Sequence, residues 1–301
     1  MSDPLAEVVG LLQPGAPFSK VVNAAGRWRV RRAENGQPFY CLCMSGSCRL
    51  VVDGHEPLGL VEGDFVLIPF AENFTMTSLE PATVEEPPVH LANGEFRLGD
   101  QHGCVDVRML IGYCDFGSSD ATLLVSLLPR LIHVRGEKRL EALAELVSEE
   151  SREQRPARDV VLARLLEVLL IEALRAFPGA SASPGLVRGL SDEYLAVALR
   201  CIHEDPAKQW TVAQLAKEAA LSRSAFFDRF SRVVGITPMD YLLAWRMALA
   251  KKLLRENAAR VTSVAARVGY SSASTFSVAF ARHVGMPPTQ YARETVRLSA
   301  G

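Results

Sequence analysis

The sequence lacks long apolar runs. No stretch of the 301 residues reaches the ~18 to 20 consecutive apolar residues that a membrane-spanning helix needs. The first ten residues, MSDPLAEVVG, also lack the basic segment followed by an apolar segment that is typical of a signal peptide. We therefore expect a protein of the cytoplasm without a membrane partner.

Cysteine is scarce, and the common catalytic motifs are missing. Six cysteines in a chain of this length are too few for a disulfide framework, and cytoplasmic thiols are normally reduced. Six histidines lie at positions 55, 90, 102, 133, 203 and 283, and none forms a His-x-His pair. No Ser-His-Asp arrangement or phosphate-binding loop is evident either. The sequence predicts no catalytic residue, no metal site and no cofactor, and so it disfavours an enzyme.

Charge divides the chain into two parts. Residues 191–301 contain 15 Lys and Arg against 9 Asp and Glu, whereas residues 1–190 contain 18 against 25. A basic region is typical of a surface that binds nucleic acid or another polyanion, although a solvated face has the same composition. The length and the hydrophobic content of 49% favour two globular domains.

The N-terminal part has the pattern of a β-rich domain. Short apolar runs such as FYCLCM, CRLVVDG and DFVLIPF alternate with Gly, Pro, Asn and Asp between residues 18 and 116. This pattern is typical of antiparallel strands joined by tight turns. It predicts a β-sandwich or barrel within residues 9–135.

Helical periodicity follows the strands. Leu140, Leu143 and Val147 recur at helical spacing, and the later stretch VVLARLLEVLLIEALRAF is apolar on more than one face. We expect two helices in residues 136–177 that pack on the β domain. Their remaining apolar face predicts a homodimer, with burial inside a single chain as the alternative. The stretch PGASASPG has a linker composition, and we expect a linker over residues 178–190.

A repeat in the basic region is the strongest signal. A shift of 50 residues pairs similar residues: Ala216 with Ala266, Ser222 with Ser272, Phe226 with Phe276, Phe230 with Phe280, Gly235 with Gly285, Pro238 with Pro288 and Tyr241 with Tyr291. Two copies in one phase indicate a duplicated unit. We expect an all-α domain over residues 191–297.

Each copy has the features of a helix-turn-helix. In the first copy, Thr211 and Ser222 are placed to cap two successive helices, and Gly235 is placed to end the second one. A long helix from Pro238 to about Arg255 then connects the copies. Two reading helices on one frame would enter successive major grooves of a DNA duplex.

The motifs resemble a known family. The stretches WTVAQLAKEAALSRSAFFDRFSRVVGITPMDYL, WRMALAKKLL and VAARVGYSSASTFSVAFARHVGMPPTQY are similar to the AraC/XylS-type DNA-binding domain. The stretches GHEPLGLVEGDFVLIP, LIGYCDF and LLPRLIHVRG resemble the cupin-type sensor domain of one branch of that family.

The resemblance implies a bacterial activator or repressor that binds double-stranded promoter DNA. Its N-terminal domain would bind an effector or dimerise, and a contact with RNA polymerase is compatible with it. Cys41 and Phe74 stand where related sensor domains often have His. This departure disfavours the alternative of a cupin metalloenzyme fused to a DNA-binding domain.

Candidate DNA contacts follow from the two reading helices. The candidates for base contacts are Arg223, Ser224, Phe227, Asp228 and Arg229 in the first copy, and Ala273, Ser274 and Ser277 in the second. The candidates for phosphate contacts are Ser222, Arg232, Arg246, Lys251, Lys252, Ser272 and Arg282. Val278 stands where family members often carry a long polar side chain, so we expect the second copy mainly to position the protein on the DNA backbone.

The stretch CLCMSGSCRL holds three of the cysteines. Strand alternation places Cys41 and Cys43 on one face, and a two-residue turn at Ser45-Gly46 would bring Cys43 opposite Cys48 across a hairpin. These thiols either line the interior as small apolar residues or form a redox pair, and their spacing disfavours a metal site. The effector is accordingly either a small molecule or an oxidant, to which some similar regulators respond.

Overall fold

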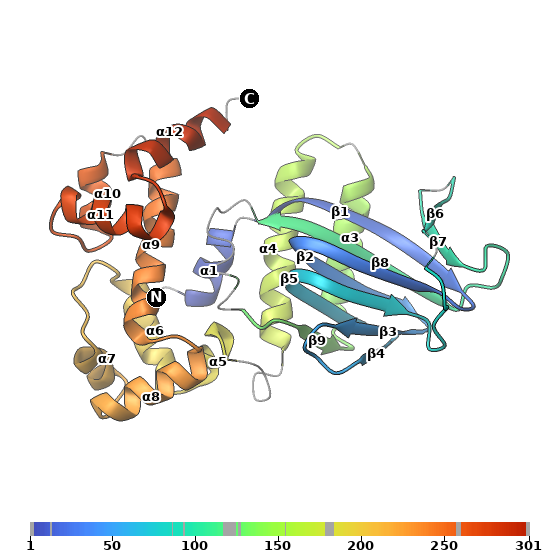
Figure 1. Ribbon diagram of the computed structural model, residues 1–301, viewed down its shortest axis with the longest axis horizontal. Coiled ribbons are helices and arrows are strands. Elements are labelled where there is room, and N and C mark those ends of the chain that lie inside the picture. The colour runs from blue at the N-terminus through green and yellow to red at the C-terminus, as the bar shows by residue number, and fades with distance from the viewer. Residues whose placement is uncertain are drawn as a thin grey trace. The chain divides into compact units, whose positions relative to one another are not determined.

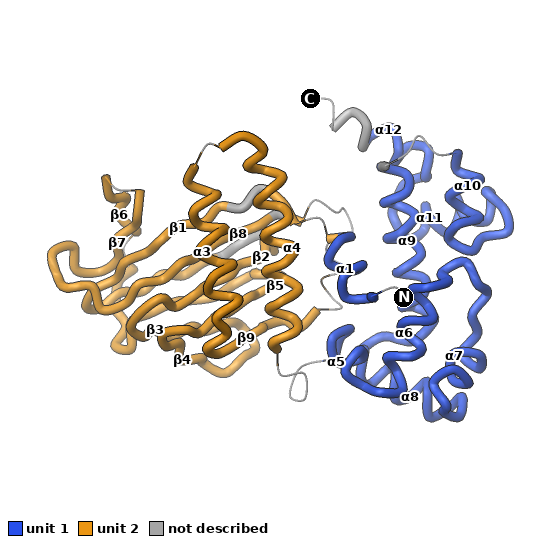
Figure 2. Tube along the Cα trace, turned by 180° about the vertical axis from the view of Figure 1, so that it is seen from behind, with its two compact units in different colours: residues 1–11, 184–301 blue, residues 12–183 orange. Residues whose placement is uncertain are grey.

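The chain divides into two compact units. The computed structural model describes residues 3–12, 14–85, 87–92, 94–116, 125, 128–153, 155–177, 184–256 and 260–298. Residues 12–183 form one unit, here called the β unit (Figure 2). Residues 1–11 and 184–301 form the other, here called the helical unit. No helix among the described residues is long and apolar enough to cross a membrane.

The β unit is built on one nine-stranded sheet (Figure 1). Its strands are β1 (Pro14–Ala25), β2 (Arg29–Ser45), β3 (Ser47–Val52), β4 (Leu58–Val61), β5 (Asp64–Thr77), β6 (Val89–His90), β7 (Phe96–Gly99), β8 (Val107–Phe116) and β9 (Ile132–Arg135). The order is β4-β3-β5-β2-β8-β1-β7-β6, and β9 pairs with β5. All pairs are antiparallel except β1 with β7. The predicted β domain with two following helices is confirmed.

Alternation along β2 separates two apolar layers. Phe39, Cys41 and Cys43 point into one buried cluster, as the sequence predicts. Tyr40, on the opposite face, stacks on Phe65 with ring centroids 6.4 Å apart. Helices α3 (Lys138–Arg152) and α4 (Arg158–Ala176) cover the face of Tyr40. Both faces of the central strands are therefore buried.

The predicted hairpin between β2 and β3 is wrong. These strands do not pair with each other, because β5 lies between them and bonds to both. The chain bends at Gly46, whose φ is +79°, and passes from β2 to the far side of β5. Ser-Gly correctly signals a turn, but a turn signal does not say which strand will lie alongside.

The helical unit contains nine helices with described bounds. They are α1 (Pro4–Leu12), α5 (Leu186–Ser191), α6 (Leu195–Glu204), α7 (Val212–Glu218), α8 (Arg223–Val234), α9 (Pro238–Glu256), α10 (Val261–Arg267), α11 (Ala273–Val284) and α12 (Pro288–Leu298), with α1 ending at the unit boundary. Helix α5 occupies much of the segment expected to be a linker, and residues 178–183 of that segment lie outside the described residues.

Helix α1 packs against α6 and α9 through a buried histidine. His203 Nδ1 lies 2.7 Å from Glu7 Oε2, and its Nε2 lies 2.7 Å from the Tyr241 hydroxyl. The Trp245 ring lies 3.9 Å from the imidazole, centroid to centroid. Burial lowers the pKa of His203, although the bond to Glu7 opposes this shift. A neutral imidazole satisfies both bonds when Nδ1–H donates to Glu7 and Nε2 accepts from Tyr241.

The internal repeat is confirmed, with one correction to its register. In the first helix of each pair the equivalent buried residues are Ala216 and Ala265, which are shifted by 49 positions. Their carbonyls accept from Leu221 N and Tyr270 N, both at 2.9 Å. The pairing of Ala216 with Ala266 is therefore wrong. The second turn is one residue longer, so the reading helices regain the shift of 50 at their Ser caps.

Candidate DNA-binding surface and effector pocket

Helix α8 is fixed by its caps and its core face. Ser222 Oγ accepts a hydrogen bond from Ala225 N at 3.3 Å, and Gly235 ends the helix with a φ of +91°. Phe226 and Phe230 are fully buried. The Phe230 ring packs edge-on against Tyr241, with centroids 5.9 Å apart. This packing determines which side of α8 meets solvent.

The outer face of α8 presents the side chains expected to contact DNA. Arg223, Ser224 and Asp228 are exposed, and Phe227 is 40% exposed. Because Phe226 points inward, its neighbour Phe227 points outward. Arg229 is already engaged, since its Nε lies 2.7 Å from Asp192 Oδ2. Of the two arginines, Arg223 is the better placed to reach a base or a phosphate.

Helix α11 is capped in the same way as α8, but the side chains on its outer face are different. Ser272 Oγ caps it by accepting from Thr275 N at 3.1 Å. Ser274 is exposed, whereas Ala273 and Ser277 are half-buried, and Ser277 Oγ donates to Ala273 O at 2.7 Å. Val278 is 72% exposed. This face is short and apolar, suited to close approach more than to polar base reading.

The phosphate candidates separate into two groups. Arg232 and Arg282 are exposed, and Lys252 is half-buried. Lys251 is only 4% exposed, and its Nζ lies 5.8 Å from the Tyr291 ring centroid. Arg246 donates to Pro206 O and Lys208 O, each at 2.8 Å. Lys251 and Arg246 therefore take part in the packing around α9. This finding corrects the expectation that they face DNA.

Sequence reasoning missed the contacts that join the two helix-turn-helix pairs. Arg246 of α9 holds the loop of residues 205–210 through the two carbonyl bonds. From the same loop, Gln209 Nε2 donates to Gly269 O at 2.5 Å. Gly269, in the turn of the second pair, has a φ of +81°. The loop thus ties the second turn to α9, and polar contacts between distant segments leave no periodic signal.

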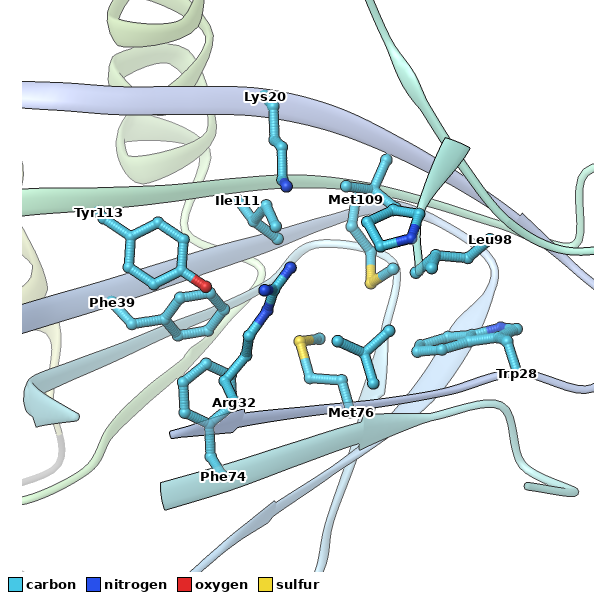
Figure 3. A pocket seen from close by; sticks show the side chains of 13 residues that line it. Lys20, Trp28, Arg32, Phe39, Phe74, Met76, Leu98, Met109, Ile111 and Tyr113 are labelled. Carbon is cyan, nitrogen blue, oxygen red and sulfur yellow. The ribbon is translucent and has the colours of Figure 1, made fainter. Parts of the chain in front are cut away.

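The β unit contains an apolar pocket that the sequence does not predict (Figure 3). It is narrow, with a cavity volume of about 30 Å³. Its lining residues are Lys20, Val22, Trp28, Val30, Arg32, Phe39, Phe74, Met76, Pro88, Leu98, Met109, Ile111 and Tyr113. They come from β1, β2, β5, β7, β8 and adjoining loops, which only the folded sheet brings together.

The three predicted sensor cysteines belong to the buried cluster that includes most of the pocket's apolar lining, but they do not line the pocket themselves. Cys41, Cys43 and Cys48 are completely buried. Cys48 Sγ lies 3.7 Å from Met109 Sδ. A hydrogen bond from the Cys48 thiol holds the pKa of Cys43 below its usual value and raises that of Cys48. Burial raises the pKa of Cys41. Cys43 and Cys48 are therefore adjacent without being hairpin partners.

The adjacent thiols lead to a test of redox sensing. We expect mild peroxide treatment of the native chain to join Cys43 to Cys48, because the Cys43 thiol has the lowered pKa that favours oxidation. Cys41 should remain a thiol. Mass spectrometry after alkylation in denaturant measures both, and exposed Cys104 reports that the oxidant reached the protein. An intact Cys43 beside an oxidised Cys104 would show that burial protects the pair. If oxidant changes the DNA binding of Cys43→Ser as much as that of the native chain, a sensing role of Cys43 is excluded.

Comparison with known proteins agrees with this architecture. The profile of a cupin family matches residues 3–177, and that of a helix-turn-helix domain matches residues 215–294. An AraC-like transcription regulator of Streptomyces lividans is 36% identical over 296 residues, covering 96% of this chain and 97% of the relative. The regulator AlkR of Acinetobacter baylyi is 28% identical over 291 residues, covering 91% of this chain and 94% of the relative.

Among solved structures, fatty-acid-bound ToxT from Vibrio cholerae aligns over 93% of this chain and 95% of its own, with 11% identity and a TM-score of 0.38. The family of the chain is shown by its similarity to the Streptomyces regulator over 96% of its length and by the matches to the two domain families. The chain belongs to the AraC-like transcription regulators, with a cupin-type N-terminal domain and a C-terminal helix-turn-helix domain.

Proposed function

We propose that α8 and α11 bind promoter DNA and that a small-molecule effector in the β-unit pocket controls this binding. The observation that supports the DNA-binding role is the pair of capped reading helices, each with a buried Phe pair and an exposed opposite face. Members of this family bind DNA, and we assign this role to the exposed faces of α8 and α11. We infer that the protein acts in the cytoplasm, where promoter DNA lies.

Within this proposal the two reading helices have different tasks. Helix α8 presents Arg223 and Asp228, which can hydrogen-bond to guanine and cytosine edges. Helix α11 presents Val278, which can contact a thymine methyl group but cannot donate or accept hydrogen bonds through its side chain. Arg282, also exposed, lies in the last turn of α11 and is suited to a phosphate. Sequence reading is therefore assigned mainly to α8.

Arg223→Ala is the test of this assignment. A lost bidentate contact to guanine costs about 1–3 kcal/mol, so we expect roughly 5- to 150-fold weaker specific binding. Ser277→Ala is the matched control in α11, because its hydroxyl is bonded to its own helix, and we expect less than about 3-fold change. The target would first be selected from genomic fragments with the full chain, and gel-shift titrations would then be run at fixed salt.

Equal losses from Arg223→Ala and Ser277→Ala would contradict the division of tasks between the helices. A loss for Arg223→Ala that is the same on specific and random DNA would assign Arg223 to a phosphate instead of a base. The salt dependence of binding separates these cases, since a lost phosphate contact reduces its slope by about one.

The exposed surface of α4 supports the predicted homodimer. Val160, Val161 and Val168 are 64%, 40% and 42% exposed, although most of the helix's other apolar residues are buried against the sheet. Leu146 on the neighbouring α3 is 48% exposed. We infer that this apolar strip is covered by a second copy of the chain, which would place two DNA-binding units on one operator.

A further inference from the structure

We propose that α11 recognises its part of the operator through the 5-methyl groups of pyrimidine bases, with Val278 as the contacting side chain. The proposal rests on α8 and α11 being the reading helices, as proposed above, and adds what α11 reads. Three observations carry it: an exposed valine, its equivalence to an aspartate of α8, and neighbouring serines that bond within α11 and its cap.

Helices α8 and α11 hold their outer faces in the same way. In both, a serine side chain caps the first turn, and a glycine in the left-handed conformation follows the last turn. The two buried phenylalanine rings are 5.6 Å apart in α8 and 5.4 Å apart in α11, centroid to centroid. In each helix the second phenylalanine packs edge-on against the tyrosine of the next helix, at an interplanar angle of 72°. Residues 50 positions apart therefore occupy equivalent places on the two outer faces.

Val278 occupies the place that Asp228 has in α8. Each lies two positions from both buried phenylalanines of its helix, on the side that faces away from the core. Asp228 is exposed, and Val278 is 72% exposed. A carboxylate can accept a hydrogen bond from cytosine N4, whereas an isopropyl group can make only apolar contacts, for which the major groove offers the thymine methyl group. At this place the two helices therefore present opposite chemistry to the bases.

The serines beside Val278 are engaged within α11 and its cap. Ser277 Oγ donates to Ala273 O at 2.7 Å. Ser274 Oγ lies 2.9 Å from Ser272 Oγ, the hydroxyl that caps the helix. Small apolar side chains make their base contacts with the thymine methyl group. The apolar surface of Val278, with Ala273 nearby, is therefore the main means by which α11 can distinguish bases.

The surroundings of Val278 fit a DNA strand. An open hollow of about 870 Å³ is lined by Leu243 of α9 and by residues of α11 that include Val278 and Arg282. Arg282 is exposed and lies four residues after Val278, about one helical turn away. A DNA strand offers a methyl group at the base edge and a phosphate on the backbone, so one strand can contact both side chains. This pairing of an apolar contact with a cation favours DNA over an apolar protein surface.

Operators that differ by single methyl groups test the proposal. In the operator selected for the Arg223 experiment, one thymine at a time is replaced by deoxyuridine, which removes the 5-methyl group and keeps every hydrogen-bonding group. The full chain is titrated with each duplex by fluorescence anisotropy at fixed salt. We expect at least one replacement to weaken binding about 4-fold, the effect of exposing one methyl group. At the same position, 5-methylcytosine should bind about 4-fold more tightly than cytosine, because its methyl group occupies the same place.

Variants at residue 278 assign the methyl contact. Val278→Ala should bind the thymine operator about 4-fold more weakly than the native chain does, and the decisive deoxyuridine replacement should then change its affinity less than about 1.5-fold. Val278→Asp, which copies Asp228, should prefer cytosine over thymine at this position. Val197→Ala is the matched control, because it truncates a valine that is 37% exposed on α6 of the same unit. It should keep both the affinity and the methyl effect.

Thermal unfolding of each variant checks that the fold is retained. The proposal would be overturned if no deoxyuridine replacement changed the affinity, or if the methyl effect persisted in Val278→Ala. Full affinity of Val278→Ala for every operator would also overturn it and would assign the exposed valine to a protein partner. Specific binding that still depends on Arg223 would then show that only the role of α11 had failed. Absence of specific DNA binding would overturn the proposed function as well.

Discussion

Val8→Asp should destabilise the helical unit, although Val8 precedes α5, the first helix of the C-terminal part of that unit, by 178 residues. Val8 and Val9 of α1 are completely buried, in a helix whose Glu7 bonds to His203. The substitution removes a buried apolar side chain and introduces an unpaired carboxylate. We expect the free energy of unfolding to fall by about 3–5 kcal/mol.

Tryptophan fluorescence during urea unfolding measures this effect. Trp210 and Trp245 lie in the helical unit and Trp28 in the β unit, so a Trp28→Phe background restricts the signal to the helical unit. Ala6→Asp is the matched control, because it adds the same charge at an exposed position of the same helix. We expect it to change stability by less than about 0.5 kcal/mol. Equal, small effects of both substitutions would show that α1 is not part of the helical unit.

The helical unit was largely predictable because its signals are local. Thr211 and Gln214 form a capping box, Ser222 caps α8, and Gly235 closes it in the left-handed conformation. Each signal needs only a few neighbouring residues, and the repeat supplies each of them twice. The pattern therefore predicts the boundaries of both reading helices and their inward aromatic residues.

Local signals do not predict that α1 belongs to the helical unit. They also do not predict that Arg246 and Lys251 pack around α9 instead of facing DNA. Helix α9 is surrounded by other helices, so a basic residue on it can be buried among carbonyls or rings as well as exposed. Similarly, α1 is separated from β1 by one residue, and adjacency in the chain suggests the wrong unit. Contacts across long stretches of sequence decide these positions, and periodicity carries no information about them.

In the β unit, the sequence predicts which side chains of a strand are buried better than it predicts which strands lie next to each other. The period of two places Cys41 and Cys43 correctly in the inner cluster. It does not determine that β5 separates β2 from β3. The pocket depends on this order, because Arg32 and Phe74 lie on the paired strands β2 and β5, while Lys20 arrives from β1. A site assembled from several strands becomes visible only after the sheet order is known.

The bend at Gly46 leads to the second large expected effect. Gly46→Ala should lower the stability of the β unit by about 3 kcal/mol or more, through two separate costs. The φ of +79° is left-handed, which costs a residue with a Cβ about 1–2 kcal/mol. A Cβ at this position would also lie 1.9 Å from Asp106 O. Asp106 cannot easily withdraw, because its N donates to Ala24 O at 2.9 Å and its Oδ2 accepts from Gly26 N at 2.6 Å.

Gly54→Ala separates the two costs. Its φ of +78° is nearly the same, but a Cβ there would meet nothing within 4 Å, so only the conformational cost of about 1–2 kcal/mol applies. Hydrogen exchange of peptides from β5 and β8, read by mass spectrometry, localises the loss to the sheet. Exchange that rises equally in both variants would mean that the close approach to Asp106 relaxes at little cost. A selective rise in Gly46→Ala would show that the Cys43–Cys48 bend is held rigidly against β8, the strand that also carries Met109 and Ile111 into the pocket.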